Sequence, residues 1–322
     1  MKLATLNDGS RDGQLVVVSR DLTSAHYATG IANRLQEVLE DWNFLSPQLQ
    51  DLSDSLNHGR ARHAFAFDPH QCLAPLPRTY LLAVGQAYAH PAPPATPCAP
   101  LRLAFGDELQ GPCAPLPGSS AAQALDFEAA LAVITGDVAQ AASPAQALDA
   151  VRLLVLASHS HYRALAEQPS RALLSTPRTA FSPVAVTPDE LMRGGESAWI
   201  HGRLNLPLQC SVNGRKFGLC DAGSDMSTHF GELIAQLCQT RRLRAGSIVS
   251  SGEVRNQDSS RGCSSIATRR AREAAQDGKS KTPWLAQGDS VTIELKGRDG
   301  QSVFGAIDQD VQIDAQPTTP AA

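Results

Sequence analysis

The sequence has few features of a membrane protein or of a nucleic-acid-binding protein. The longest apolar runs, at 15–18 and 153–157, fall far short of the ~20 residues that a membrane-spanning helix needs. The beginning, MKLATLNDGSRDG, lacks the apolar core of a secretory signal peptide. The formal net charge is −4, and there is no basic block that would neutralise phosphates. We therefore expect a cytoplasmic protein with no membrane and no nucleic acid among its partners.

Cysteine is scarce and widely spaced. The seven cysteines stand at positions 72, 98, 113, 210, 220, 238 and 263, and no CxxC pair occurs. An odd number at wide spacing is atypical of a disulfide framework or a structural zinc site. We interpret these residues as free thiols that pack as small hydrophobic side chains. The sequence also lacks GxGxxG, Walker and GxSxG motifs, which argues against nucleotide-binding folds and serine hydrolases of those types.

The apolar pattern predicts an α+β protein that is mostly β. A chain of 322 residues suits a small domain followed by a larger one. Helical spacing predicts helices over 28–44, from Ser46-Pro47 to Asn57, over 225–240, and from 266 to a stop at Gly278. Strands are predicted at 14–20, 79–85, 126–136, 149–158 and 247–254, with a hairpin turn at Asn213-Gly214. Because no βαβ rhythm is present, the sheet of the larger domain should be antiparallel or mixed.

Glu128 is a candidate metal ligand within the strand DFEAALAVITG. Strand alternation places Asp126, Glu128 and Ala130 on one face, and Phe127 with its alternate neighbours on the other. A carboxylate that points into a β-lined cleft suits Mg²⁺ or Ca²⁺, which prefer oxygen ligands. The alternative is a solvent-facing strand, on which acidic residues are ordinary.

Histidines provide the other candidates for chemistry. His159 and His161 follow the predicted strand 149–158 in SHSHYR and should face the same way. Together with Glu128 they could bind zinc, or they could supply a general base; the alternative is a pair of polar loop residues. His90, after the first strand of the larger domain, is a candidate catalytic base, with an ordinary surface residue as the alternative.

Five strings, in order along the chain, carry a family resemblance: LPRTYLLAVGQAY, DFEAALAVITGDV, TAFSPVAVTPDEL, NGRKFGLCDAGSDM and SVFGAIDQDV. Their order and spacing resemble the bacterial branch of the fumarylacetoacetate hydrolase family, as does the N-terminal string MKLATLNDGSRDGQLVVVSRDLT. The resemblance implies a small SH3-like N-terminal domain (1–75), a mixed β-roll (76–314) and a disordered tail (315–322). It also implies a homodimer and Mg²⁺- or Ca²⁺-assisted cleavage of a carbon–carbon bond in a small β-diketo or oxo-acid.

The residues that the family uses for its metal are partly replaced here. The family's E-x-E pair corresponds to Glu128 and Ala130, and its Asn-Asp corresponds to Ser158 and His159. The resemblance therefore implies a metal site on Glu128 and His159, with one carboxylate where the family has about three. Mg²⁺ or Ca²⁺ is expected from the family, Zn²⁺ or Mn²⁺ would suit the imidazole, and a vacant pocket would hold no ion.

The resemblance also implies residues that contact substrate. The family's Gly-Ser-Gly-Thr turn corresponds to residues 250–253 and ends in Glu253, while His90 lies near the position of the catalytic histidine. Tyr88 and Arg163 complete the predicted substrate-binding set; for Arg163 a structural ion pair is the favoured interpretation.

Two functions remain open from the sequence. The first is an active hydrolase on a small oxo-acid, with Glu128 and His159 on the metal and His90 as the base. The second is an inactive homologue that serves as a ligand-binding or partner subunit. A metal centre, or a histidine and a glutamate within ligand distance of each other, would favour the first function. A collapsed or solvent-open pocket with Glu128 bonded to an arginine or to backbone would favour the second.

Overall fold

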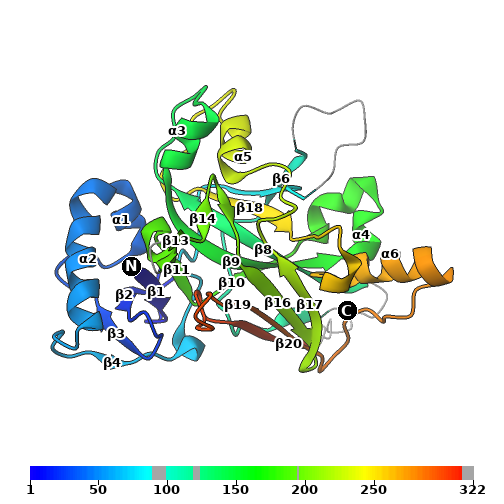
Figure 1. Cartoon of the computed structure of the whole chain (residues 1–322), viewed down its shortest axis with the longest axis horizontal. Coiled ribbons are helices and arrows are strands. Elements are labelled where there is room, and N and C mark those ends of the chain that lie inside the picture. The colour runs from blue at the N-terminus through cyan, green and yellow to red at the C-terminus, as the bar shows by residue number, and fades with distance from the viewer. Residues whose placement is uncertain (89–98, 119–123, 194–195, 314–322) are drawn as a thin grey trace, which may run out of the picture.

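The computed structural model describes residues 1–88, 99–118, 124–193 and 196–313, and two β-sheets organise them (Figure 1). The predicted tail 315–322 lies outside the described residues, as does His90. Within the described part of the chain, no helix is long and apolar enough to cross a membrane.

The larger sheet runs through the middle of the molecule. In spatial order its strands are β4 (Phe65–Ala66), β3 (Ser24–Tyr27), β2 (Gln14–Val18), β1 (Lys2–Leu6), β11 (Val184–Val186), β9 (Val151–Tyr162), β8 (Leu125–Thr135), β18 (Ile248–Glu253), β5 (Leu82–Gly85) and β6 (Leu101–Ala104), with β10 (Thr179–Phe181) paired to β9. The smaller sheet has the order β17 (Arg215–Asp221), β16 (Pro207–Val212), β19 (Ser290–Leu295), β20 (Ile307–Ile313) and β7 (Leu116–Gly118). Two short ribbons pair β12 (Met192–Arg193) with β13 (Glu196–Ser197), and β14 (Trp199–Ile200) with β15 (Arg203–Leu204).

Short helices lie around the sheets. The α-helices are α1 (Leu35–Glu40), α2 (Trp42–Asn57), α3 (Pro144–Asp149), α4 (Arg163–Ala166), α5 (Phe230–Leu237) and α6 (Ile266–Asp277). The 3₁₀ helices are η1 (Pro69–Gln71), η3 (Pro169–Ser175), η4 (Pro188–Leu191) and η5 (Ser259–Arg261).

The sheets are mixed, as predicted. In the larger sheet β18 pairs antiparallel with β8 and parallel with β5, and in the smaller sheet β20 pairs parallel with β7. The mostly β, α+β fold class is therefore confirmed. The hairpin at Asn213-Gly214 joins β16 to β17, and α6 ends where Gly278 adopts a left-handed conformation, both as the sequence predicts.

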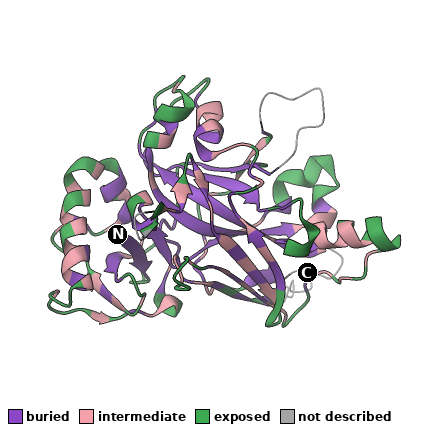
Figure 2. Cartoon of the chain, viewed as in Figure 1, coloured by how far each residue is buried: buried purple, intermediate pink, exposed green. Residues whose placement is uncertain are grey.

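The central strands are buried on both faces (Figure 2). Phe127 and Leu131 of β8 belong to a hydrophobic cluster that includes residues of the smaller sheet. Ala130 and Ile134 belong to a second cluster, which includes the apolar side chains of α1 and α2. The predicted alternation along β8 is thus confirmed, whereas a solvent-facing strand is not what the structure has. Burying a polar group among apolar side chains costs free energy unless the group is hydrogen-bonded or paired. Each polar group on β8 therefore needs a partner.

Helix and strand ends differ from the predictions in three places. The predicted helix 28–44 begins only at Leu35 and breaks at Asp41, and α2 then begins at Trp42 and contains Pro47 in its interior. The helix predicted over 225–240 is confined to α5. Strand β9 continues past the predicted end at 158, because it stays paired with β8 as far as Tyr162. Tertiary pairing extends this strand beyond what its local sequence indicates.

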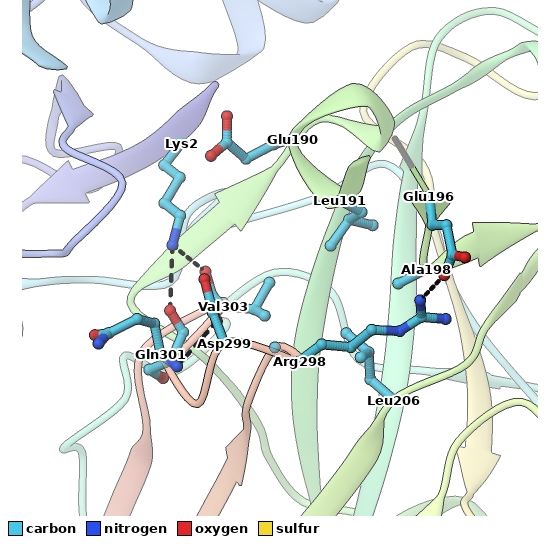
Figure 3. A pocket seen from close by; sticks show the side chains of 12 residues that line it. Lys2, Glu190, Leu191, Glu196, Ala198, Leu206, Arg298, Asp299, Gln301 and Val303 are labelled. Atoms are coloured by element: carbon cyan, nitrogen blue, oxygen red, sulfur yellow. Dashed lines mark hydrogen bonds and ion pairs between the residues drawn. The ribbon is translucent and has the colours of Figure 1, made fainter. Parts of the chain in front are cut away.

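The N-terminal segment continues the larger sheet, since β1 pairs with β11. Lys2 is buried, and its Nζ donates hydrogen bonds to the carbonyl oxygens of Val303 (2.8 Å) and Ser302 (3.2 Å), as Figure 3 shows. A cavity of about 30 Å³ lies beside this lysine, and Glu196 and Arg298 form an ion pair at its wall. These contacts join β1 to the connection between β19 and β20.

Candidate functional site

Polar side chains gather at one end of the sheet face that β8 and β9 share. Glu128 lies directly opposite His159, and Asp126 directly opposite His161, in the antiparallel register of the two strands. Side chains that are opposite in such a pair lie within contact distance of each other. The register therefore brings two carboxylates and two imidazoles together on one face.

Glu128 is held through both carboxylate oxygens. Its Oε1 lies 2.8 Å from Nη2 of Arg163, and its Oε2 lies 2.8 Å from Nε2 of His161. Burial alone would raise the pKa of Glu128, but the neighbouring His161 and Arg163 outweigh it and hold the pKa well below its usual range. Glu128 is therefore an ionised carboxylate whose charge is already neutralised by protein groups.

Arg163 also binds Asp126, whose side chain has no exposed surface. Nη2 and Nε of the arginine lie 2.7 and 2.8 Å from Oδ2 of Asp126. The backbone N–H groups of Ile266 and Ala267, at the start of α6, donate to the same carboxylate at 2.7 and 3.1 Å. Asp126 thus anchors α6 and Arg163 to β8, which agrees with the structural interpretation of Arg163.

A second arginine approaches Glu128 from β6. Nη2 of Arg102 lies 3.9 Å from Oε2 of Glu128 and 3.3 Å from Nε2 of His161. Burial lowers the pKa of Arg102, and the nearby negative charge of Glu128 opposes this effect. The side chain of Arg102 is 37% exposed against 22% for Arg163, so its cation is the more accessible of the two.

His159 is fully buried and uses both ring nitrogens. Nδ1 lies 2.9 Å from Oγ1 of Thr179, and Nε2 lies 2.8 Å from Oγ of Ser250. Burial, together with the nearby Arg102, lowers its pKa to about 3. His159 is therefore neutral and engaged by two hydroxyl groups rather than by Glu128.

Glu253 lies next to this cluster, on the last position of β18. Its Oε1 accepts a hydrogen bond from Oγ of Ser265 at 2.5 Å, and its Oε2 lies 2.7 Å from Nε of Arg255. The strand is irregular just before it, because Gly252 has a φ of +71° and a Cβ there would lie 2.0 Å from the carbonyl oxygen of Gly85. Only glycine allows this close approach between β18 and β5.

Tyr88 is also buried, and its hydroxyl donates a hydrogen bond to the carbonyl oxygen of Ala222 at 2.5 Å. Burial raises its pKa, so the phenol stays protonated. The structure thus buries His159, Glu253 and Tyr88, leaves Glu128 and Arg163 partly exposed, and brings Glu128 and Arg163 into direct contact. His90 lies outside the described residues.

No three His, Cys, Asp or Glu side chains are placed to hold a metal ion within 1–88, 99–118, 124–193 and 196–313. A separate cleft of about 1290 Å³ is lined by residues of α1, by residues between 70 and 80, and by residues 107–114. Arg34, Arg78 and Tyr80 line this cleft, whereas Glu128 and its partners do not.

Comparison with known proteins identifies the fold and its class. The N-terminal domain 2 model of fumarylacetoacetase matches residues 1–78, and the C-terminal model of fumarylacetoacetate (FAA) hydrolase matches residues 80–312. The chain belongs to the fumarylacetoacetate hydrolase family, which confirms the resemblance seen in the sequence. No curated protein matches this chain at a significant level of sequence similarity.

Solved structures share the fold at low sequence identity. A probable 2-hydroxyhepta-2,4-diene-1,7-dioate isomerase from Mycobacterium abscessus is 16% identical, with a TM-score of 0.68 over 98% of this chain and 99% of that one. The fumarylacetoacetate hydrolase of Exiguobacterium antarcticum is 16% identical, with a TM-score of 0.67 over 97% and 99%. Maleylpyruvate hydrolase from Sphingobium sp. SYK-6, in complex with manganese(II) and pyruvate, is 16% identical, with a TM-score of 0.64 over 97% and 98%.

Sequence reasoning missed Arg102 and Arg255, and it did not single out His161 as the partner of Glu128. A signal for Arg102 is present, since it stands between two leucines in the strand LRLA and must point to the opposite face. Arg255 follows Glu253 by two residues, a spacing that places two strand side chains on the same side.

Proposed function

We propose that this protein binds a small oxo-acid beside the polar cluster around Glu128, and that it does so without the hard divalent ion expected for its family. Relatives of the same fold support the class of ligand: one is a complex with pyruvate, and another is named as an isomerase of an unsaturated dioate. Arg102 is 37% exposed, and its guanidinium group is well suited to pair with a carboxylate.

The observation that carries the proposal is the engagement of Glu128 by Arg163 and His161. A hard divalent ion needs several oxygen ligands, most of them anionic. Position 130 is alanine and position 159 is a neutral histidine, so Glu128 is the one carboxylate left from the ligand set that the resemblance implies. An ion at Glu128 would displace one of two cationic or hydrogen-bonding partners and lie near Arg102.

The donor set therefore does not fit Mg²⁺ or Ca²⁺. Glu253 does not supply the missing charge, because Ser265 and Arg255 bind its two oxygens. A protein cation already neutralises each carboxylate near the site. We accordingly propose a binding function, as a ligand-binding or partner subunit, and not metal-assisted cleavage of a carbon–carbon bond.

Isothermal titration of the EDTA-treated protein with pyruvate tests this proposal. We expect saturable binding in the absence of any ion, and no increase in affinity when Mg²⁺ or Ca²⁺ is added. The affinity of the Glu128→Ala variant for pyruvate should differ from that of the wild type, because Arg163 and His161 lose their common partner. Pyruvate binding that appears only after a divalent ion is added would refute the proposal.

A second candidate function is metal-assisted hydrolysis or isomerisation of an oxo-acid at a rebuilt site, with His90 as the base. The position of His159 directly opposite Glu128, with His161 in contact with Glu128, favours it, since imidazole and carboxylate together suit Zn²⁺ or Mn²⁺. His159 would have to release Ser250 to serve as a ligand.

Titration with Zn²⁺ and Mn²⁺ separates the two functions. The second function requires micromolar binding of one ion that is lost in both Glu128→Ala and His159→Ala. It also requires ion-dependent turnover of an acylpyruvate, measured as loss of the enol absorbance. Neither result is expected under the first function.

We further propose that each chain comprises two domains, 1–75 and 76–314, and that two such chains form a cytoplasmic homodimer. Leu103, 60% exposed on β6, and the neighbouring Phe105, 43% exposed, lie at the last strand of the larger sheet and support a contact between copies. Free thiols at the described cysteines support a reducing compartment. Light scattering coupled to size-exclusion chromatography tests the dimer: a mass of a single chain would refute it.

A further inference from the structure

We propose that Arg102 acts as the built-in cation of this site, and that its guanidinium receives the carboxylate of the oxo-acid where the family would use a metal ion. This inference rests on the proposed binding function. It concerns which residue of this chain recognises the ligand.

The place of Arg102 in the sheet is the first argument. Arg102 pairs with Val84 of β5, so its side chain shares the face of Val84, which belongs to the same hydrophobic cluster as Ala130. The guanidinium thereby reaches the polar end of this face, where Nη2 lies 3.9 Å from Glu128 and 3.3 Å from His161. β6 is the last strand in the order of the larger sheet, at some distance from β8 in that order (Figure 1).

The distribution of charge is the second argument. Arg163 uses Nε and Nη2 on Asp126 and Glu128, and Arg255 uses Nε and Nη2 on Glu253. Among the residues that the structure describes, the partners of Arg102 are His161 and Glu128, and it reaches both through Nη2. Arg102 is therefore the arginine of this cluster whose contact with a protein carboxylate is the longest, at 3.9 Å.

The chemistry of the group is the third argument. A guanidinium offers a planar fork of N–H donors that matches a carboxylate, and it keeps its charge at all ordinary pH values. The contact of Arg102 with Glu128, at 3.9 Å, is longer than a hydrogen bond. A ligand carboxylate can thus bind the guanidinium without displacing a strong protein contact. Glu128 and His161 would orient the arginine while the ligand occupies its exposed side.

The test compares Arg102→Met, Arg102→Lys and a matched control, Arg255→Met, in metal-free isothermal titration with pyruvate. Arg102→Met removes the charge with similar volume, and we expect at least a 10-fold loss of affinity. Arg102→Lys keeps the charge but not the bidentate fork, so its affinity for pyruvate should lie between those of the wild type and Arg102→Met. Arg255→Met removes a more exposed arginine that is already paired with Glu253, and should stay within 3-fold of the wild type.

The experiment distinguishes failure of the inference about Arg102 from failure of the proposed binding function. Wild-type protein that binds no pyruvate without an ion refutes the proposed function, and the inference with it. Wild-type binding that persists unchanged in Arg102→Met and Arg102→Lys overturns the inference alone. An equal loss in Arg255→Met also overturns it, because general loss of positive charge would then explain the effect. If Arg102→Met does not fold, as judged by its thermal unfolding, Arg102→Lys decides: affinity equal to the wild type overturns the inference.

Discussion

Arg163 and Asp126 form an ion pair in which the carboxylate is completely buried while the guanidinium side chain is 22% exposed. The pair links the start of α4, directly after β9, to β8, and the carboxylate in turn accepts hydrogen bonds from the first backbone N–H groups of α6. The same guanidinium reaches Glu128, so one arginine serves two carboxylates. This arrangement makes stability and site geometry depend on a common side chain.

We expect Arg163→Met to destabilise the protein by about 3–5 kcal/mol, because it leaves a buried carboxylate without its counter-charge. Urea unfolding at neutral pH measures this loss. The double variant Arg163→Met/Asp126→Asn should recover part of it, since the unpaired charge is then removed. A loss below about 1 kcal/mol, the size typical of a surface ion pair, would contradict the structural role.

His159 should stay neutral in the folded protein far below the pH at which an ordinary histidine is protonated. Its pKa is lowered to about 3 in the folded state, against 6.5 for an ordinary histidine. The unfolded chain therefore binds the extra proton first, and the free energy of unfolding should fall as the pH drops from about 6.5 towards 3. The slope from this one group is at most about 1.4 kcal/mol per pH unit.

NMR of the imidazole nitrogens in His159 measures this pKa directly. His159→Gln, which cannot be protonated, should show a smaller loss of stability over the same pH range. An imidazole that titrates near 6.5 would refute the buried, hydroxyl-bound environment of His159.

Glu128 should add a further acid sensitivity at lower pH. Its pKa in the folded state lies well below the 4.5 of an ordinary glutamate, so its contribution to stability is present above about 4.5 and is lost as the pH falls through the folded pKa. Acid unfolding below pH 4.5 should accordingly be steeper for the wild type than for Glu128→Gln. Equal slopes would show that His161 and Arg163 do not stabilise the ionised carboxylate.

Gly252→Ala should cost about 3 kcal/mol or more, because alanine combines an unfavourable positive φ with a collision against Gly85. Gly214 is a matched control: its φ is +69°, yet nothing lies within 4 Å of a Cβ placed there. Gly214→Ala should therefore cost only about 1 kcal/mol, the conformational part. Thermal unfolding of both variants measures the difference, and equal losses would argue against close contact between β18 and β5.

Local features of the fold could be predicted from sequence because their causes are local. Asn213 and Gly214 both adopt positive φ, at 51° and 69°, as the turn of a tight hairpin requires. Gly278 ends α6 for a similar reason, and the alternation of Phe127 with Glu128 follows from the pleat of a strand. Family membership could also be predicted, because the five strings keep the family's order along the chain although identity to solved structures of the same fold is only 16%.

The partners of Glu128 were decided only by the tertiary structure. Arg102 and His161 are separated by 59 positions in the sequence, and His159 and Ser250 by 91. Such contacts depend on which strands pair and in which register, and a shift of one residue would turn every side chain of a strand to the other face. The sequence by itself determined the strands, the turn and the retained carboxylate at Glu128. Only the pairing of β8 with β9, and the arrival of β6 at the same face, decided that this carboxylate meets arginine and histidine, because contacts between distant segments have no local signature.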